Sequence, residues 1–200
     1  MTVTILLVII IVLCSYLWYK QIHKYHFILY PTNLLIAIIL SNESPNYITF
    51  GFVSLVFFTV VMFAGVLDKG VLRKRLLMIR AELAVLGTIY IIPHFLAYTE
   101  LVLEDIGLFR ATVEYYIGLI IAIILIPLTI TSFPYIRKQM NFKQWKKLHL
   151  LAYGVYGLIA IHLIIQNTIR IWLYVGLFLI YLVFRLYTMH TSPSVKRLPQ

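Results

Sequence analysis

Long apolar runs separated by short basic loops are the feature that most constrains this chain. Several runs approach or exceed the roughly 18–20 apolar residues that a helix needs to cross the hydrocarbon core of a bilayer. Hydrophobic residues make up 62% of the sequence and charged residues only 12%, which excludes a water-soluble domain. The sequence therefore predicts an all-α integral membrane protein built as a bundle of six transmembrane helices. We expect the spans at about Thr2–Tyr19, Tyr47–Leu67, Ile79–Leu103, Val113–Phe133, Leu148–Gln166 and Ile171–Thr188.

The N-terminal quarter allows two topologies. The apolar segment Phe27–Leu40 has only 14 residues and contains Pro31. As a helix it would reach about 21 Å, which is shorter than the roughly 30 Å hydrocarbon core. We expect a short re-entrant segment beside the six spans, with a seventh span that extends back through Ile22 as the alternative. The chain then divides into an N-terminal anchor with a partial segment (1–46), a helical bundle (47–190) and a tail (191–200).

Basic residues gather in the loops on one predicted side of the membrane. Thirteen of the 17 Lys and Arg residues lie there, namely Lys69, Arg73, Lys74, Arg75, Arg80, Arg137, Lys138, Lys143, Lys146, Lys147, Arg185, Lys196 and Arg197. Five of the seven acidic residues lie on the other side: Glu43, Glu100, Glu104, Asp105 and Glu114. By the positive-inside rule the basic side is cytoplasmic. We expect a multi-pass protein of the plasma membrane, in contact with lipid and with a cytoplasmic C-terminus. The net charge of +10 reflects this orientation and does not indicate nucleic-acid binding.

Two histidines lie inside apolar segments at matched distances from the basic loops. His94 follows Arg80 by 14 residues, and His162 follows Lys147 by 15 residues. If both loops lie on the same side, the two imidazoles lie at nearly equal depth on parallel helices. An ionisable side chain inside a bilayer is costly and is therefore a functional candidate. Two facing histidines suit the iron of a b-type heme. The alternative is that each imidazole only satisfies a backbone carbonyl or a hydroxyl group.

A third histidine lies on the same predicted helix as His162. His149 precedes it by 13 residues, which is about 20 Å along a helix. At 100° per residue the two imidazoles would point about 140° apart around an ideal helix. They are therefore not expected to face one neighbouring helix together. His23, His26 and His190 are weaker candidates, because they lie close to an interface or in the tail.

Two stretches of the sequence carry a resemblance to a known family. They read RLLMIRAELAVLGTIYIIPHFLAY and TSFPYIRKQMNFKQWKKLHLLAYGVYGLIAIH, and the second contains a W-x-x-L-H-x-x-x-Y core that begins at Trp145. From about Leu72 to Thr188 the chain resembles the ferric reductase-like transmembrane domain superfamily. It is most similar to the heme-binding membrane subunit of the bacterial methionine sulfoxide reductase system.

The resemblance implies heme ligands at His94, His149 and His162. In relatives with two hemes, the helix of the first ligand has another histidine closer to the cytoplasm, but the region around Arg80 has none. We therefore expect one heme b, held by His94 and His162, and leave a second heme at His149 open. Otherwise His149 would lie near a cytoplasmic-side quinone, a flavin such as FMN, or a heme propionate. Arg80 is a candidate for binding a propionate, with a membrane anchor as the alternative.

A heme between two histidines has no open coordination position, which suits electron transfer. The sequence shows no Gly-rich dinucleotide loop after a strand, so the expected electron source is a quinol, a flavin or a separate reductase. The expected function is a membrane cytochrome b, an electron-transfer subunit of an oxidoreductase. Its acceptor would be extracytoplasmic: a partner reductase, ferric iron or flavin. The alternative is a heme-free small transporter or a membrane assembly subunit whose histidines are structural.

Overall fold

Helices make up the regular structure of the described chain. The computed structural model describes residues 2–43, 51–106, 112–166 and 171–191, and no β-strand occurs in these ranges. The predicted all-α class is therefore confirmed for them, as expected where backbone groups must be satisfied without water. The predicted domain boundary after residue 46 and the tail beyond residue 191 lie outside these ranges. Four helical stretches in the described residues are long and apolar enough to cross a membrane: Ile5–Lys24, Arg80–Glu104, Val113–Ile130 and Phe142–Ile165. The count of six spans stays a prediction.

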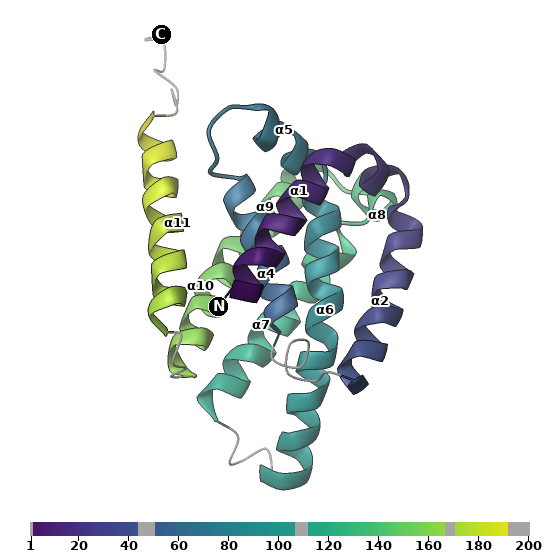
Figure 1. The fold of residues 1–200 in the computed structure, drawn as a ribbon, viewed down its shortest axis with the longest axis vertical. Helices are drawn as coiled ribbons and strands as arrows, with labels where there is room; N and C mark the ends of the chain where they lie inside the picture. The colour runs from purple at the N-terminus through teal and green to yellow at the C-terminus, as the bar shows by residue number, and fades with distance from the viewer. Residues whose placement is uncertain (1, 44–50, 107–111, 167–170, 192–200) are drawn as a thin grey trace.

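The helices run back and forth along one bundle (Figure 1). In chain order they are α1 (Thr2–Lys24), α2 (His26–Glu43), α4 (Phe52–Ala64), α5 (Val71–Met78), α6 (Arg80–Leu101), a π-helical turn η1 (Val102–Ile106), α7 (Val113–Ile130), α8 (Pro134–Gln139), α9 (Phe142–His149), α10 (Leu151–Ile165) and α11 (Ile171–Thr191). The short helices α5, α8 and α9 lie together at one end of the bundle, shown at the top of Figure 1. They carry most of the basic residues of the two loops, and we call this end the basic end.

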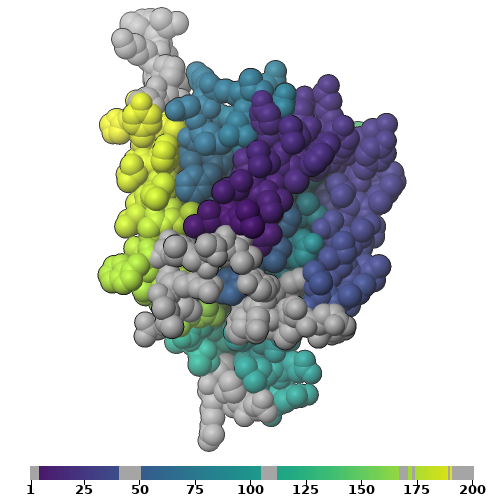
Figure 2. Space-filling view, viewed as in Figure 1, coloured from purple at the N-terminus to yellow at the C-terminus, as the bar shows by residue number. Residues whose placement is uncertain are grey.

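The N-terminal segment forms two long helices. α1 runs towards the basic end and α2 returns from it (Figure 1). α2 continues through Pro31, and its 18 residues reach about 27 Å. It is longer than the predicted segment because the helix begins at His26 and continues beyond Leu40 to Glu43. This antiparallel pair resembles the seventh-span alternative more closely than a re-entrant segment. In Figure 2, α1 lies across the front of the molecule between α11 and α2.

Four helices, α4, α6, α7 and α10, form the centre of the bundle. α6 packs against α4 and α7, and α7 packs against α10. The α4–α6 contact is especially close, because the buried Ser54 hydroxyl donates a hydrogen bond of 2.8 Å to the Gly87 carbonyl. A Cβ atom at position 87 would lie only 3.2 Å from Cβ of Phe57. Glycine at this position therefore allows the two helices to approach, as small residues do in membrane bundles.

The helix predicted from Leu148 to Gln166 contains a turn near its start. α9 ends at His149, Leu150 is a turn, and α10 begins at Leu151. α9 has its own N-cap, because the Asn141 side chain accepts a 2.9 Å hydrogen bond from the backbone N–H of Lys143. Leu150 keeps a helical backbone, so Phe142–Ile165 still forms one continuous helical stretch that carries both His149 and His162.

The arrangement of the basic end predicts the orientation of the chain. Reporter fusions after Lys74, after Lys143 and at the C-terminus should all report the cytoplasm, because basic loops are retained there. A fusion near Asp105 should report the other side. A cytoplasmic signal at Asp105 would contradict the orientation. A reporter at the N-terminus separates the two topologies, because the antiparallel α1–α2 pair places it on the side of Asp105.

Candidate functional site

Two cavities lie one after the other along the four central helices. The first has a volume of about 310 Å³, and we call it the histidine-pair cavity, because His94 of α6 and His162 of α10 both line it. The second has a volume of about 380 Å³ and lies towards the basic end. We call it the basic-end cavity; its lining includes Arg80, Arg137, Lys146 and His149. The three histidines that the sequence singles out therefore belong to two separate spaces.

His94 and His162 face each other across the first cavity. Their ring centres are 6.5 Å apart, and their planes are perpendicular. Two imidazole nitrogens bound to one metal ion by bonds of about 2 Å would place the ring centres about 6.3 Å apart. The observed separation is therefore compatible with His94 and His162 as ligands of one metal ion. The rest of the lining is largely apolar and includes Phe58, Phe95, Leu119 and Leu125.

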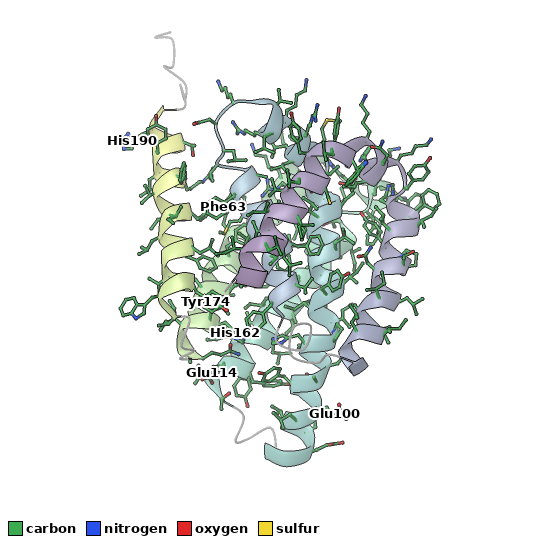
Figure 3. The ribbon with its side chains drawn as sticks, in the orientation of Figure 1. Phe63, Glu100, Glu114, His162, Tyr174 and His190 are labelled. Atoms are coloured by element: carbon green, nitrogen blue, oxygen red, sulfur yellow. The ribbon has the colours of Figure 1, made fainter. Side chains whose placement is uncertain are left out.

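The His162 ring is held by a backbone group of the neighbouring helix. Nδ1 of His162 lies 3.0 Å from the carbonyl oxygen of Glu114, in the first turn of α7. A carbonyl only accepts hydrogen bonds, so Nδ1 carries the hydrogen and donates it. The lone pair of a neutral ring then lies on Nε2, which is the arrangement that oriented histidine ligands use. Figure 3 shows His162 and Glu114 near the end of the bundle that carries Glu100, far from His190.

Two glycines make room for the two imidazoles. Gly51 precedes α4 with a φ of 69°, and a Cβ atom there would lie 3.3 Å from Cγ of His94. Gly118 lies on α7, and a Cβ atom there would lie 3.5 Å from Cε1 of His162. Each imidazole thus lies against a residue without a side chain. On its other side, the His94 ring contacts Tyr98, with ring centres 4.9 Å apart.

The donor set fits a metal that brings most of its own ligands. No group of three or more His, Cys, Asp or Glu side chains is placed to hold a metal ion in the described residues. Two imidazoles alone leave a metal ion incompletely coordinated, whereas a heme brings most of the ligands of its iron with it, and His94 and His162 would hold it. The histidine pair and the apolar lining therefore fit a heme better than a bare ion.

Stacked side chains border the basic-end cavity around His149. The Trp145 and His149 rings are 4.2 Å apart between centres and are inclined by 30°. The Arg137 guanidinium lies over the other ring of this stack, 4.5 Å from the centre of the Trp145 ring. The Trp145 indole N–H donates a 3.1 Å hydrogen bond to the carbonyl of Thr131. His149 is thus part of a cation–indole–imidazole stack at the basic end.

One nitrogen of the His149 ring is engaged by a hydroxyl group at the end of α7. Nε2 of His149 lies 3.1 Å from the hydroxyl oxygen of Thr131. The same hydroxyl lies within hydrogen-bond distance of the carbonyls of Pro127, at 2.7 Å, and Leu128, at 3.3 Å. Thr131 therefore links His149 to the last turn of α7.

Sequence comparison identifies the fold to which these helices belong. The chain matches the family model of the ferric reductase-like transmembrane component over residues 50–160. The matched region is more than half of the chain, and it contains α4, α6, α7 and most of α10. The chain belongs to this family. The family match, the apolar helices and the basic loops together support a membrane protein with a role in membrane electron transfer.

One curated relative also matches part of this ferric reductase-like chain. It is an uncharacterized protein of Treponema pallidum (strain Nichols), 32% identical over 97 residues. The match covers 44% of this chain and 26% of that protein, so the chain spans about a quarter of the length of the relative. No solved structure matched the chain.

The predicted site residues fall into two groups in this family member. His94 and His162 are brought together, whereas His149 and Arg80 line the basic-end cavity instead. Binding of a heme by any of them stays a prediction. The contacts of the two rings with the Glu114 carbonyl and the Thr131 hydroxyl were not predicted from the sequence. A backbone carbonyl leaves no signal in a sequence, and a threonine near a helix end is common in bundles.

A contact between a histidine and a buried carboxylate in the N-terminal half was also not predicted from the sequence. Nδ1 of His23, at the end of α1, contacts a carboxylate oxygen of Glu82 in α6. The Glu82 side chain is 4% exposed, and the His23 side chain is 58% exposed. His23 therefore pairs with a buried carboxylate instead of being solvated alone. This contact connects the turn between α1 and α2 to α6.

The glycines beside the imidazoles predict a graded loss of stability. Gly51→Ala should lower the free energy of unfolding by about 1–2 kcal/mol, because an L-residue is strained at positive φ. The new Cβ would also press on His94. Gly118→Ala should cost less, because its Cβ meets His162 at an ordinary contact distance. Thermal unfolding in detergent, followed by circular dichroism, measures the difference. Gly154→Ala is the control, because no atom lies within 4 Å of its added Cβ. Equal stability of all three variants would contradict the proposed crowding at Gly51.

Proposed function

We propose that this chain is a membrane b-type cytochrome that carries electrons through one heme b held by His94 and His162. The observation that carries the proposal is the pair of imidazoles facing each other 6.5 Å apart across an apolar cavity. A heme with two imidazole ligands exchanges single electrons without an open coordination position, which suits electron transfer better than substrate binding. Membership of the ferric reductase-like family supports this chemistry.

The protein residues prepare the two ligands in different ways. The Glu114 carbonyl holds the His162 ring and strengthens it as a ligand, because a hydrogen bond from Nδ1 raises the basicity of Nε2. Gly51 leaves space for the His94 ring, and Gly118 lies at an ordinary contact distance from the His162 ring. The lining of the histidine-pair cavity is largely apolar.

The basic-end cavity is the proposed site of electron entry. A donor there would be a quinol, a flavin such as FMN, or the edge of a separate reductase. The guanidinium groups of Arg80 and Arg137 suit an anionic group of such a donor. The imidazole of His149 lines this cavity and would accept the proton that a quinol or reduced flavin releases with its electrons. A second heme at His149 is less well supported, because no other histidine lies among the described residues that line this cavity.

We further propose that electrons leave towards an extracytoplasmic acceptor. The histidine pair lies away from the basic end, which the positive-inside rule places in the cytoplasm. By resemblance to the heme-binding membrane subunit of methionine sulfoxide reductase, the acceptor would be a soluble extracytoplasmic reductase. Ferric iron or a flavin outside the cell are other acceptors of the same chemistry. The plasma membrane, with the C-terminus in the cytoplasm, is the location that such a role requires.

The first experiment tests the ligand pair. The purified protein should show a Soret band and α/β bands that sharpen on reduction with dithionite. His94→Ala and His162→Ala should each lose most of the heme, because each removes one of the two side chains that would hold it. A pyridine hemochrome assay measures heme per protein. His149→Ala is the matched control and should keep most of its heme. A colourless wild-type protein would favour a transporter or an assembly subunit instead, and near-normal heme in either ligand variant would remove the proposed pair.

The second experiment tests electron entry. His149→Ala should slow heme reduction by a quinol or reduced flavin several-fold, because the proton acceptor is lost. Reduction by dithionite should be unchanged, because dithionite needs no proton acceptor in the cavity. Stopped-flow absorbance in the Soret band measures both rates. Two hemes per wild-type chain, with one lost in His149→Ala, would show instead that His149 is a ligand.

A further inference from the structure

The linings of the two cavities meet at two side chains. Of the described residues that line the cavities, only Phe58 and Leu125 line both. On α4 the first cavity is lined by Phe52, Ser54, Leu55 and Phe58, and the second by Phe58 and Val61. Leu55, Phe58 and Val61 are three residues apart and therefore lie on one face of the helix. Phe58 is the point at which this face passes from one cavity to the next.

The Phe58 ring is held in place from several sides. It is buried, with 6% of its surface exposed, and it packs with Leu125, Leu128 and Val155 in one apolar cluster. Its back lies against α6, where a Cβ atom at Gly87 would come within 3.2 Å of Cε1 of the ring. The hydrogen bond from Ser54 to the Gly87 carbonyl fixes the two helices one turn away. The ring therefore has little freedom to move out of the wall.

We propose that Phe58, backed by Gly87 and completed by Leu125, is a partition that keeps a molecule in the basic-end cavity from reaching the imidazoles of His94 and His162. Its meaning for the reaction rests on the proposed function, but the partition itself does not require a heme. A quinol or flavin carries oxygen and nitrogen atoms that bind metals. Behind the partition, such a donor gives up electrons without becoming a ligand and without opening a water-filled path across the bundle.

The neighbouring residue Phe57 supplies a matched control. It has the same side chain on the same helix and is also buried, with 8% of its surface exposed. Its ring stacks on Tyr90, with ring centres 5.6 Å apart, and it lines neither cavity. Truncation of Phe57 and of Phe58 removes the same atoms from the same helix. Only the Phe58 change is expected to open the wall.

Cysteine labelling tests the partition in the full chain without requiring a heme. Cys14, the single cysteine of the sequence, is first replaced by alanine. Ala122→Cys then reports on the histidine-pair cavity, and Ala152→Cys reports on the basic-end cavity. A small, membrane-impermeant methanethiosulfonate reagent is added to the basic-end side of vesicles, in the orientation that the reporter fusions establish. Labelling at Ala152→Cys shows that the reagent enters the basic-end cavity.

If Phe58 is a partition, the cysteine of Ala122→Cys should be protected from the reagent as long as Phe58 is present. Phe58→Ala should raise its labelling rate on the order of tenfold, which corresponds to a barrier lowered by about 1.4 kcal/mol. Phe57→Ala should leave the rate unchanged. If Phe58→Ala does not fold, Leu125→Ala replaces it in the test, because this change should open the same wall from α7. Equal labelling with and without Phe58, or an equal increase in Phe57→Ala, would overturn the partition. A protein that shows the expected labelling pattern but binds no heme would contradict the proposed function without contradicting the partition.

Discussion

The close contact between α4 and α6 is the interaction on which both cavities depend. No hydrophobic force drives helices together inside a bilayer, so small residues and interhelical hydrogen bonds decide their packing. Gly87 lets α4 approach, and the Ser54 hydroxyl fixes the approach through the Gly87 carbonyl. Since α6 carries His94 and α4 carries Phe58, this one contact sets the position of an imidazole and of the wall between the cavities. A side chain at position 87 would displace both.

The features that could be predicted from the sequence depend on the polarity of single residues and on their positions along the chain. Because burying polar groups in a membrane is costly, the apolar runs, the basic end and the similar depth of His94 and His162 can be recognised from the order of the residues alone. Two features were not predictable in this way: the length of α2 and the second cavity. Each is decided by contacts between helices. α2, for example, packs along α6, and it extends beyond the apolar segment that hydropathy defines.

The three histidines show why residue type alone did not settle the site. His162 donates from Nδ1 to the Glu114 carbonyl, which leaves the lone pair of a neutral ring on Nε2, whereas Nε2 of His149 is engaged with the Thr131 hydroxyl. The chemistry of each ring follows from one partner on a neighbouring helix. Neither partner is distinctive in the sequence, since one is a backbone group and the other is a common residue. The positions of the histidines along the chain could be predicted from the sequence, whereas the hydrogen-bond partners of their rings depend on the neighbouring helices.

The order of the cavities along the bundle has an energetic consequence for the proposed function. A donor at the basic end would release its protons on the cytoplasmic side, and the electron would move away from that side. With the cytoplasm electrically negative, outward movement of an electron is favourable, by about 2.3 kcal/mol per 100 mV for a full crossing. This gain is kept only if protons do not follow the electron through the bundle. The wall of Phe58 and Leu125, both buried and apolar, lies where such a path would have to pass. The separation of the two cavities is therefore as important to the proposed electron transfer as the ligand pair itself.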